Sequence, residues 1–156
     1  MELEDLVEEA RAHRITFTLW SRRWDDFKAS VTLNWKDHPF VPEEKINIPP
    51  TPGVYAFLLQ PRIANGLEAS YVLYIGESSN LQERFDNYLQ EIKSKNARPR
   101  IRVYLNQYKS FLRFCCATLP SGVSTTTIED ALLAAFIPPL NVKLPAEVRA
   151  VVAAFV

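Results

Sequence analysis

The segment from Gly53 to Arg84 reads GVYAFLLQPRIANGLEASYVLYIGESSNLQER, and it decides the fold of this chain. Its first part, residues 54–59, and its later part, residues 71–75, are apolar and aromatic runs of strand length. Residues 60–70, which separate the two runs, contain the loop-forming residue types proline, asparagine and glycine. The segment therefore predicts a two-stranded hairpin with a long connection, followed at once by a helix.

This helix is expected to run from about residue 80 to residue 95. Asn80 can cap its first turn, and Glu83 lies three residues later, as in a capping box. Arg84 and Tyr88 lie four residues apart on one flank, so that both could contact a single phosphate. The positions with helical spacing on the buried side are Leu81, Phe85, Tyr88, Leu89 and Ile92.

Beyond Pro99 the pattern predicts two more strands, at residues 101–105 and 111–118, and two more helices. The first helix, residues 125–137, is amphipathic and is ended by two prolines, and the second covers residues 145–155. Glu129 lies at the edge of the apolar face of the first helix. A half-buried carboxylate is costly unless it is paired or binds a cation, and otherwise Glu129 is a rim residue.

We divide the chain into an N-terminal extension, residues 1–48, and a main module, residues 49–156, because a proline-rich segment separates them. Residues 3–12 predict an amphipathic helix with an acidic outer face. Residues 15–35 contain all three tryptophans, with helical spacing at first and with strand-like alternation at residues 31–35. Such an aromatic cluster is usually core or a docking surface, and less often a platform for stacking bases.

The composition is that of an ordinary globular protein, with 47% hydrophobic and 23% charged residues. No apolar stretch approaches the roughly 20 residues of a membrane span, so we expect no membrane association. The acidic N-terminus does not resemble a secretion signal. The adjacent Cys115 and Cys116 suit reduced thiols, and we therefore expect a cytoplasmic protein.

The formal net charge is zero, which argues mildly against binding to nucleic acid. Residues 93–113, however, are rich in lysine and arginine and contain no acid, as a local phosphate-facing surface would. The alternative interpretation of residues 93–113 is a basic helix end and loop that are simply exposed to solvent. On a strand, the alternating residues 98, 100 and 102 would share one face. The candidate nucleic-acid-binding residues are Lys93, Lys95, Arg98, Arg100, Arg102 and Lys109.

Gly53-Val54-Tyr55 and Tyr74-Ile75-Gly76 resemble the paired strand motifs that name the GIY-YIG nucleases. The resemblance extends over roughly residues 50 to 145, and residues 76–84 are similar to the loop and helix start after the second motif. Four further positions match the family's catalytic arginine, the tyrosine of its repair-nuclease branch, its metal-binding glutamate and its closing asparagine. These positions are Arg84, Tyr88, Glu129 and Asn141.

The resemblance implies an α/β (α+β) fold, with a small, mixed, mainly antiparallel sheet of three strands flanked by helices. It also implies a DNA endonuclease, acting in repair, restriction, defence or mobile-element homing, that hydrolyses phosphodiesters with one Mg²⁺ or Mn²⁺ ion on Glu129. Arg84 would stabilise the charge on phosphorus, and Tyr88 would orient the phosphate. Tyr55 or Tyr74 would be the general base, and Asn141 would support the site by hydrogen bonding.

Glu77 departs from the family pattern, which often has a basic residue after the second glycine. A carboxylate there would repel phosphate or add a second metal ligand. An inactive nuclease-like domain that binds nucleic acid or a protein is therefore the alternative. The expected partner is DNA, and the N-terminal extension could bind a partner protein or form a homodimer.

Overall fold

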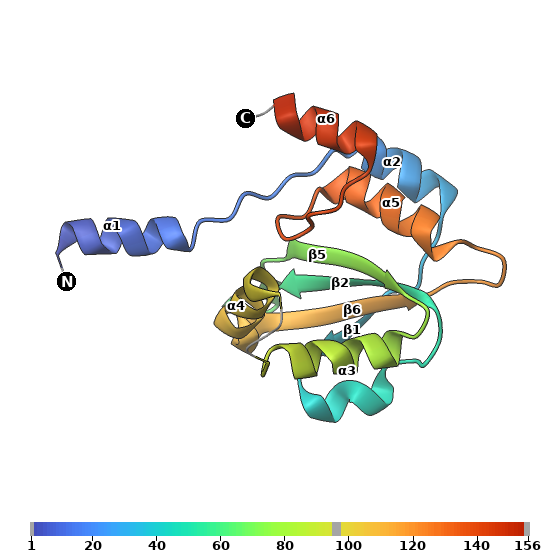
Figure 1. Ribbon diagram of the computed structural model, residues 1–156, viewed down its shortest axis with the longest axis horizontal. Helices are drawn as coiled ribbons and strands as arrows, with labels where there is room; N and C mark the ends of the chain where they lie inside the picture. The colour runs from blue at the N-terminus through green and yellow to red at the C-terminus, as the bar shows by residue number, and fades with distance from the viewer. Residues whose placement is uncertain (1, 95–97, 155–156) are drawn as a thin grey trace.

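The computed structural model of the chain describes residues 2–94 and 98–154. Its centre is a four-stranded sheet with the strand order β1-β6-β2-β5, and every neighbouring pair is antiparallel (Figure 1). A separate two-stranded hairpin, β3 and β4, lies within the connection between β2 and β5. The strands are β1 (Lys36–Pro39), β2 (Gly53–Leu59), β3 (Arg62–Ala64), β4 (Leu67–Glu68), β5 (Tyr71–Ser78) and β6 (Leu112–Thr118).

The predicted count of three strands is wrong, because β1 adds a fourth from the N-terminal extension, and the sheet is wholly antiparallel rather than mixed. Residues 36–39 read Lys-Asp-His-Pro, which lacks the apolar residues of a typical strand. Such a strand is tolerated at an edge, where proline and charges are common. The strand-like residues 31–35 have no assigned secondary structure.

Helices cover both faces of the sheet (Figure 1). α3 packs on one face, and α5 packs on the other with α2 beside it. The helices are α1 (Leu3–Ala12), α2 (Ser21–Ser30), α3 (Leu81–Glu91), α4 (Pro99–Gln107), α5 (Thr125–Phe136) and α6 (Ala146–Ala154), with 3₁₀ turns η1 (Pro42–Asn47) and η2 (Lys109–Phe111). The helices predicted at residues 3–12, 80–95, 125–137 and 145–155 correspond to α1, α3, α5 and α6, and the strand at residues 111–118 corresponds to β6.

The strand predicted at residues 101–105 is wrong, because this segment lies in helix α4. Pro99 occupies the first helical turn, where its missing N–H costs nothing. Ile101 and Leu105, four residues apart, are both buried, so the apolar spacing of this segment is helical. The three arginines at 98, 100 and 102 therefore do not share one face of a strand.

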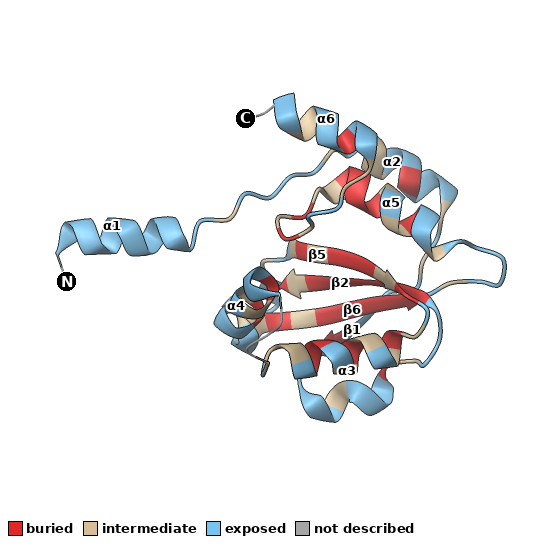
Figure 2. Ribbon diagram, viewed as in Figure 1, coloured by how far each residue is buried: buried red, intermediate tan, exposed pale blue. Residues whose placement is uncertain are grey.

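The sheet is buried on both faces, as the colouring of Figure 2 shows. On β2 the alternation places Tyr55 and Phe57 in the cluster with α3, and Val54 and Ala56 in the cluster with α5. Helix α1, by contrast, has no buried residue. None of the helices in the described ranges is long and apolar enough to cross a membrane.

The glycine of the first motif is required by close packing. A Cβ at Gly53 would lie 2.4 Å from the Ala117 carbonyl oxygen and 2.6 Å from a Leu81 methyl carbon. The backbone of β2 therefore approaches β6 and the start of α3 more closely than any other residue type permits.

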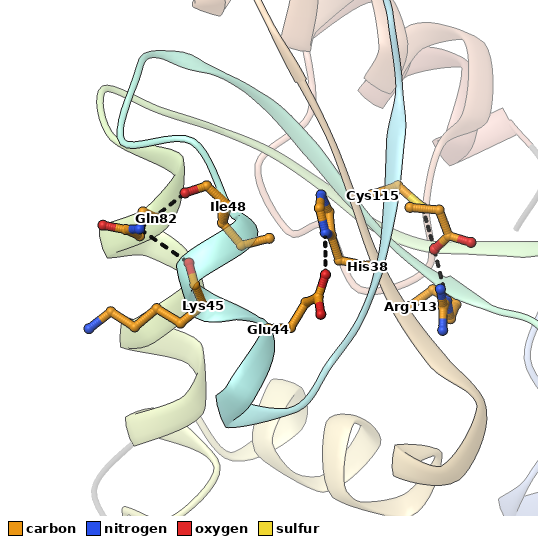
Figure 3. Close-up of polar contacts among 8 residues, drawn as sticks. His38, Glu44, Lys45, Ile48, Gln82, Arg113 and Cys115 are labelled. Atoms are coloured by element: carbon orange, nitrogen blue, oxygen red, sulfur yellow. Dashed lines mark hydrogen bonds and ion pairs between the residues drawn. The ribbon is translucent and has the colours of Figure 1, made fainter.

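Polar contacts fix residues 36–48 to the body of the molecule (Figure 3). Arg113 Nε of β6 donates to Asp37 Oδ1 at 2.8 Å, and the Cys115 thiol donates to the same oxygen at 3.6 Å. From α3, Gln82 Nε2 donates to the carbonyl oxygens of Lys45 and Ile48, each at 3.2 Å. This part of the N-terminal extension is therefore integral to the sheet and to α3.

Candidate functional site

A cleft of about 570 Å³ lies beside β5, and it gathers three of the predicted site residues. Tyr74 comes from β5, Glu129 comes from α5, and Asn141 comes from the loop after α5. The cleft is also lined by three cationic side chains: Arg98, Arg100 and Lys143. Segments that are far apart in the sequence thus place a phenol, a carboxylate and several cations around one opening.

Asn141 supports this cleft through the backbone of β5. Its Oδ1 accepts from the Ile75 N–H at 2.9 Å, and its Nδ2 donates to the Ile75 carbonyl oxygen at 2.7 Å. The Leu140 N–H also donates to the Leu73 carbonyl oxygen, at 3.2 Å. The loop therefore continues the pairing at the outer edge of β5 and holds it beside Tyr74.

Tyr55 and Tyr88 form a buried pair between the sheet and α3. Their hydroxyl oxygens lie 2.7 Å apart, and both side chains are almost fully buried. Burial, followed by the neighbouring phenols, raises the pKa of Tyr55 well above its usual value, and burial also raises the pKa of Tyr88. Tyr74 is only half-buried and lines the open cleft, so these tyrosines occupy different environments.

Arg84 and Arg98 line a second cleft, of about 350 Å³, together with Tyr88 and Glu91. Arg98 borders both clefts, and Glu91 binds its guanidinium with two hydrogen bonds, at 2.8 and 3.0 Å. The same guanidinium lies over the Tyr88 ring, 5.5 Å from the ring centroid. Arg98 is thus held between the two clefts.

Glu129 is half-buried on α5, and burial raises the pKa of its carboxyl, with further contributions from the charges of Glu77 and Asp130. The backbone of Glu77 and the charge of Arg84 act in the opposite direction. Arg84 itself lines the second cleft and not the cleft that contains Glu129. A divalent cation would remove the repulsion that the Glu129 carboxylate experiences.

Glu77 has a defined partner that the sequence did not indicate. The Thr126 hydroxyl lies 3.0 and 3.1 Å from the two carboxylate oxygens of Glu77 and donates to them. Thr126 precedes Glu129 by one helical turn, so the hydrogen bond joins β5 to the part of α5 that carries Glu129. Only the tertiary structure brings these residues together, since Glu77 and Thr126 are 49 positions apart.

The basic residues predicted to bind nucleic acid are spread over more than one surface. Arg98 and Arg100 line the cleft with Tyr74, whereas Arg102 donates to the Ser94 carbonyl oxygen at 3.1 Å. The remaining exposed candidates, Lys93 and Lys109, line neither cleft, and Lys95 lies outside the described residues. Lys143 was missed, because one lysine in a loop carries no pattern.

The oxygen donors around Glu129 suit a hard divalent cation. Mg²⁺ uses one or two carboxylates and keeps several water ligands, so Glu129 alone, or Glu129 with Glu77, matches its requirements. The two described ranges contain no group of three or more His, Cys, Asp or Glu side chains that could together hold a metal ion.

Compared with known proteins, the chain matches no family model, no curated protein and no solved structure.

Proposed function

We propose that this protein is a divalent-metal-dependent endonuclease that hydrolyses phosphodiester bonds in DNA. The observation that carries the proposal is the cleft beside β5, where Tyr74, Glu129 and Asn141 meet. Cationic residues that suit a phosphate backbone line the same cleft. The resemblance of the two strand motifs to the GIY-YIG nucleases supports the same activity.

The metal would be held by Glu129, the half-buried carboxylate of the cleft. A bound Mg²⁺ or Mn²⁺ ion would supply charge neutralisation on the phosphate and on the leaving oxygen. Arg84, with its permanently charged planar guanidinium, would stabilise the charge that develops on the phosphate oxygens. Arg98 would help to hold the scissile phosphate, because it borders the clefts of both Arg84 and Glu129.

We assign the role of general base to Tyr74 rather than to Tyr55. Tyr74 lines the open cleft, where it could take a proton from the attacking water. Tyr55 is buried, its hydroxyl is bonded to Tyr88, and its raised pKa opposes formation of a phenolate. Tyr55 and Tyr88 then act as positioning residues that support the wall of the site near Arg84.

The first experiment is cleavage of supercoiled plasmid by the parent protein with Mg²⁺, with Mn²⁺ or with EDTA. We expect metal-dependent nicking that falls about 100-fold or more in Glu129→Gln and Arg84→Ala. Asp130→Asn and Arg22→Gln are matched controls, because both residues are exposed and lie outside the cleft. Cleavage that persists in EDTA, or that is equal in all variants, would contradict the proposal.

Metal binding gives a second readout that does not depend on catalysis. We expect Mn²⁺ to raise the melting temperature of the parent protein and of Asp130→Asn, but not that of Glu129→Gln. Without metal, Glu129→Gln should be at least as stable as the parent, because burial and Glu77 disfavour the charged carboxylate. This comparison separates loss of the metal site from loss of the fold.

The second candidate function is an inactive domain that binds nucleic acid, and the position of Glu77 favours it. This carboxylate is held by Thr126 near Glu129, where it would repel a phosphate. An inactive domain would bind DNA without cleaving it in either metal, and Glu77→Gln would strengthen that binding. If Glu77 instead assists the metal, Glu77→Gln would weaken both Mn²⁺ binding and nicking.

A further inference from the structure

Residues 13–20, which we call the N-terminal strap, connect α1 to α2 as an extended segment (Figure 1). Ile15 packs against the core, and His13 Nδ1 is hydrogen-bonded to Gln107 Nε2 of α4. Phe17 stacks on Tyr71 with ring centroids 4.8 Å apart, and the Trp20 N–H donates to the Ala135 carbonyl oxygen at 2.7 Å. The strap is therefore fixed to the body at successive points.

Between the strap and α4 lies a recess of about 350 Å³, which we call the strap recess. The strap lines it with Arg14, Ile15 and Thr16, and α4 lines it with Arg100 and Tyr104. Pro139 and Leu140 complete its lining. Its volume lies at the lower end of the range for small-ligand sites. Its lining combines two cationic side chains, a hydroxyl and an aromatic ring.

The charges of the strap recess suit an anion. Within the described part of the chain, neither Arg14 nor Arg100 forms an ion pair with a carboxylate. Arg100 Nη2 donates to the Pro139 carbonyl oxygen at 2.9 Å, which orients the guanidinium and leaves other N–H groups for a ligand. Two guanidinium groups that line one recess supply the charge and the N–H donors that a phosphate requires.

The aromatic wall of the recess is also held in place. The Tyr104 ring stacks on Tyr108, with centroids 6.0 Å apart and an interplanar angle of 27°. Both rings also pack against the core. An aromatic ring that is fixed beside a phosphate site is the arrangement with which proteins bind single nucleotides of an unpaired strand.

The strap recess adjoins the cleft that contains Tyr74, Glu129 and Asn141, because Arg100 and Leu140 line both. We infer that the strap recess binds one nucleotide of an unpaired nucleic-acid strand, with its phosphate between Arg14 and Arg100 and its base against Tyr104. A base within a duplex is stacked and paired, so it could not reach Tyr104. The choice of ligand rests on the nuclease function proposed above. A nucleotide in the recess would mean that the substrate of the nuclease contains an unpaired segment.

The test is fluorescence anisotropy in EDTA, with a labelled single strand and with a hairpin duplex of related sequence. We expect Arg14→Gln and Tyr104→Leu each to weaken single-strand binding about tenfold and to change duplex binding less than twofold. Arg22→Gln removes an exposed arginine from α2 and is the charge control. Tyr104→Phe keeps the ring and should bind as the parent does.

Arg14 is exposed, so its substitution tests the recess even if Tyr104→Leu fails to fold. The inference is overturned if Arg14→Gln binds the single strand as tightly as Arg22→Gln does, or if duplex binding falls equally. Adenosine monophosphate is the second probe. If it binds as tightly as the strand, the recess holds free nucleotides and the strand assignment is wrong.

These outcomes are separable from those of the nuclease test. Loss of single-strand binding in Arg14→Gln, from a protein that never cleaves DNA, would support the recess and contradict the nuclease. Metal-dependent cleavage by the parent, together with unchanged single-strand binding in Arg14→Gln, would support the nuclease and contradict the recess.

Discussion

Gly76 lies opposite Tyr55 in the pairing of β5 with β2, and a Cβ at position 76 would come within 2.3 Å of the tyrosine hydroxyl oxygen. It would also lie 2.4 Å from the ring carbon that carries this hydroxyl. The buried Tyr55 ring cannot move away easily, because it stacks on Phe114 with ring centroids 5.2 Å apart and its hydroxyl is hydrogen-bonded to that of Tyr88. The glycine of the second motif is therefore required by the tyrosine of the first.

We predict that Gly76→Ala lowers the free energy of unfolding by about 1–3 kcal/mol, as overpacking of a core does. The measurement is urea unfolding. Combining Gly76→Ala with Tyr55→Leu should cost less than the sum of the two single changes, because the clash is removed. If the two effects simply add, the close approach of Tyr55 to Gly76 is not the cause of the loss.

At the scale of single residues, the sequence predicted the candidate positions but not their partners. Tyr55, Tyr74 and Glu129 were named through the resemblance of their motifs to the GIY-YIG nucleases. The hydrogen bond between Tyr55 and Tyr88 joins residues that are 33 positions apart in the sequence. The hydrogen bond between Glu77 and Thr126 joins residues that are 49 positions apart. Local periodicity contains no information about such contacts, so only the tertiary structure could supply them.

The elements that the sequence predicted well are those whose apolar spacing is long and regular. Helix α3 has a side-chain cap, in which Asn80 Oδ1 accepts from the Glu83 N–H at 3.0 Å, and its buried face has helical spacing. Helix α4 was mistaken for a strand because its alternating arginines gave a period of two that concealed the spacing of Ile101 and Leu105. Strand β1 was missed because pairing with β6, rather than its own composition, makes it a strand.

The attachment of η1 to β1 depends on one polar pair, shown in Figure 3. His38 Nδ1 of β1 lies 2.8 Å from Glu44 Oε1 of η1, and the His38 side chain is buried. This hydrogen bond is the main reason that the pKa of Glu44 is lowered. A carboxyl whose pKa is lower in the folded state stabilises the fold above its unfolded pKa, near 4.3, and the stabilisation disappears as the pH falls through the folded pKa.

We therefore predict that Glu44→Gln lowers the free energy of unfolding by about 1 kcal/mol at pH 7. The deficit relative to the parent should shrink below about pH 4, where the parent carboxyl is itself protonated in the unfolded state and then in the folded state. Denaturant unfolding at several pH values measures this difference in the free energy of unfolding between the parent and Glu44→Gln. Glu43→Gln, an exposed neighbour in η1, is the control, and a deficit that is constant with pH would exclude the ionised Glu44 carboxylate as its cause.

At the scale of the whole molecule, the net charge of zero conceals a separation of charge. Helix α1 contributes acidic residues on a segment without buried contacts, while Arg98, Arg100 and Lys143 converge on the cleft beside β5. The overall composition could therefore not show where nucleic acid would bind. The basic stretch at residues 93–113 contributes Arg98 and Arg100 to this cleft, but the cleft also depends on the loop after α5, which lies far along the chain.

The two helices of the N-terminal extension differ in how much they contribute to stability. Helix α1 has no buried residue, and an isolated helix of 10 residues is marginal in water. In α2, by contrast, Phe27 is buried, and Trp24 packs against Phe136 of α5 with ring centroids 5.3 Å apart. We expect deletion of residues 2–12 to change the melting temperature by less than about 2 °C, because no core contact is lost.

Phe27→Ala should instead cost about 3–5 kcal/mol, because it leaves a cavity between α2 and the face of the sheet that α5 covers. Thermal unfolding of both variants, measured at several protein concentrations, makes the comparison. If the deletion destabilises the protein as much as Phe27→Ala does, and more so at high concentration, then α1 docks on a second copy of the chain. A small effect that is independent of concentration would mean that the structural part of the extension begins with the N-terminal strap, where Ile15 first reaches the core.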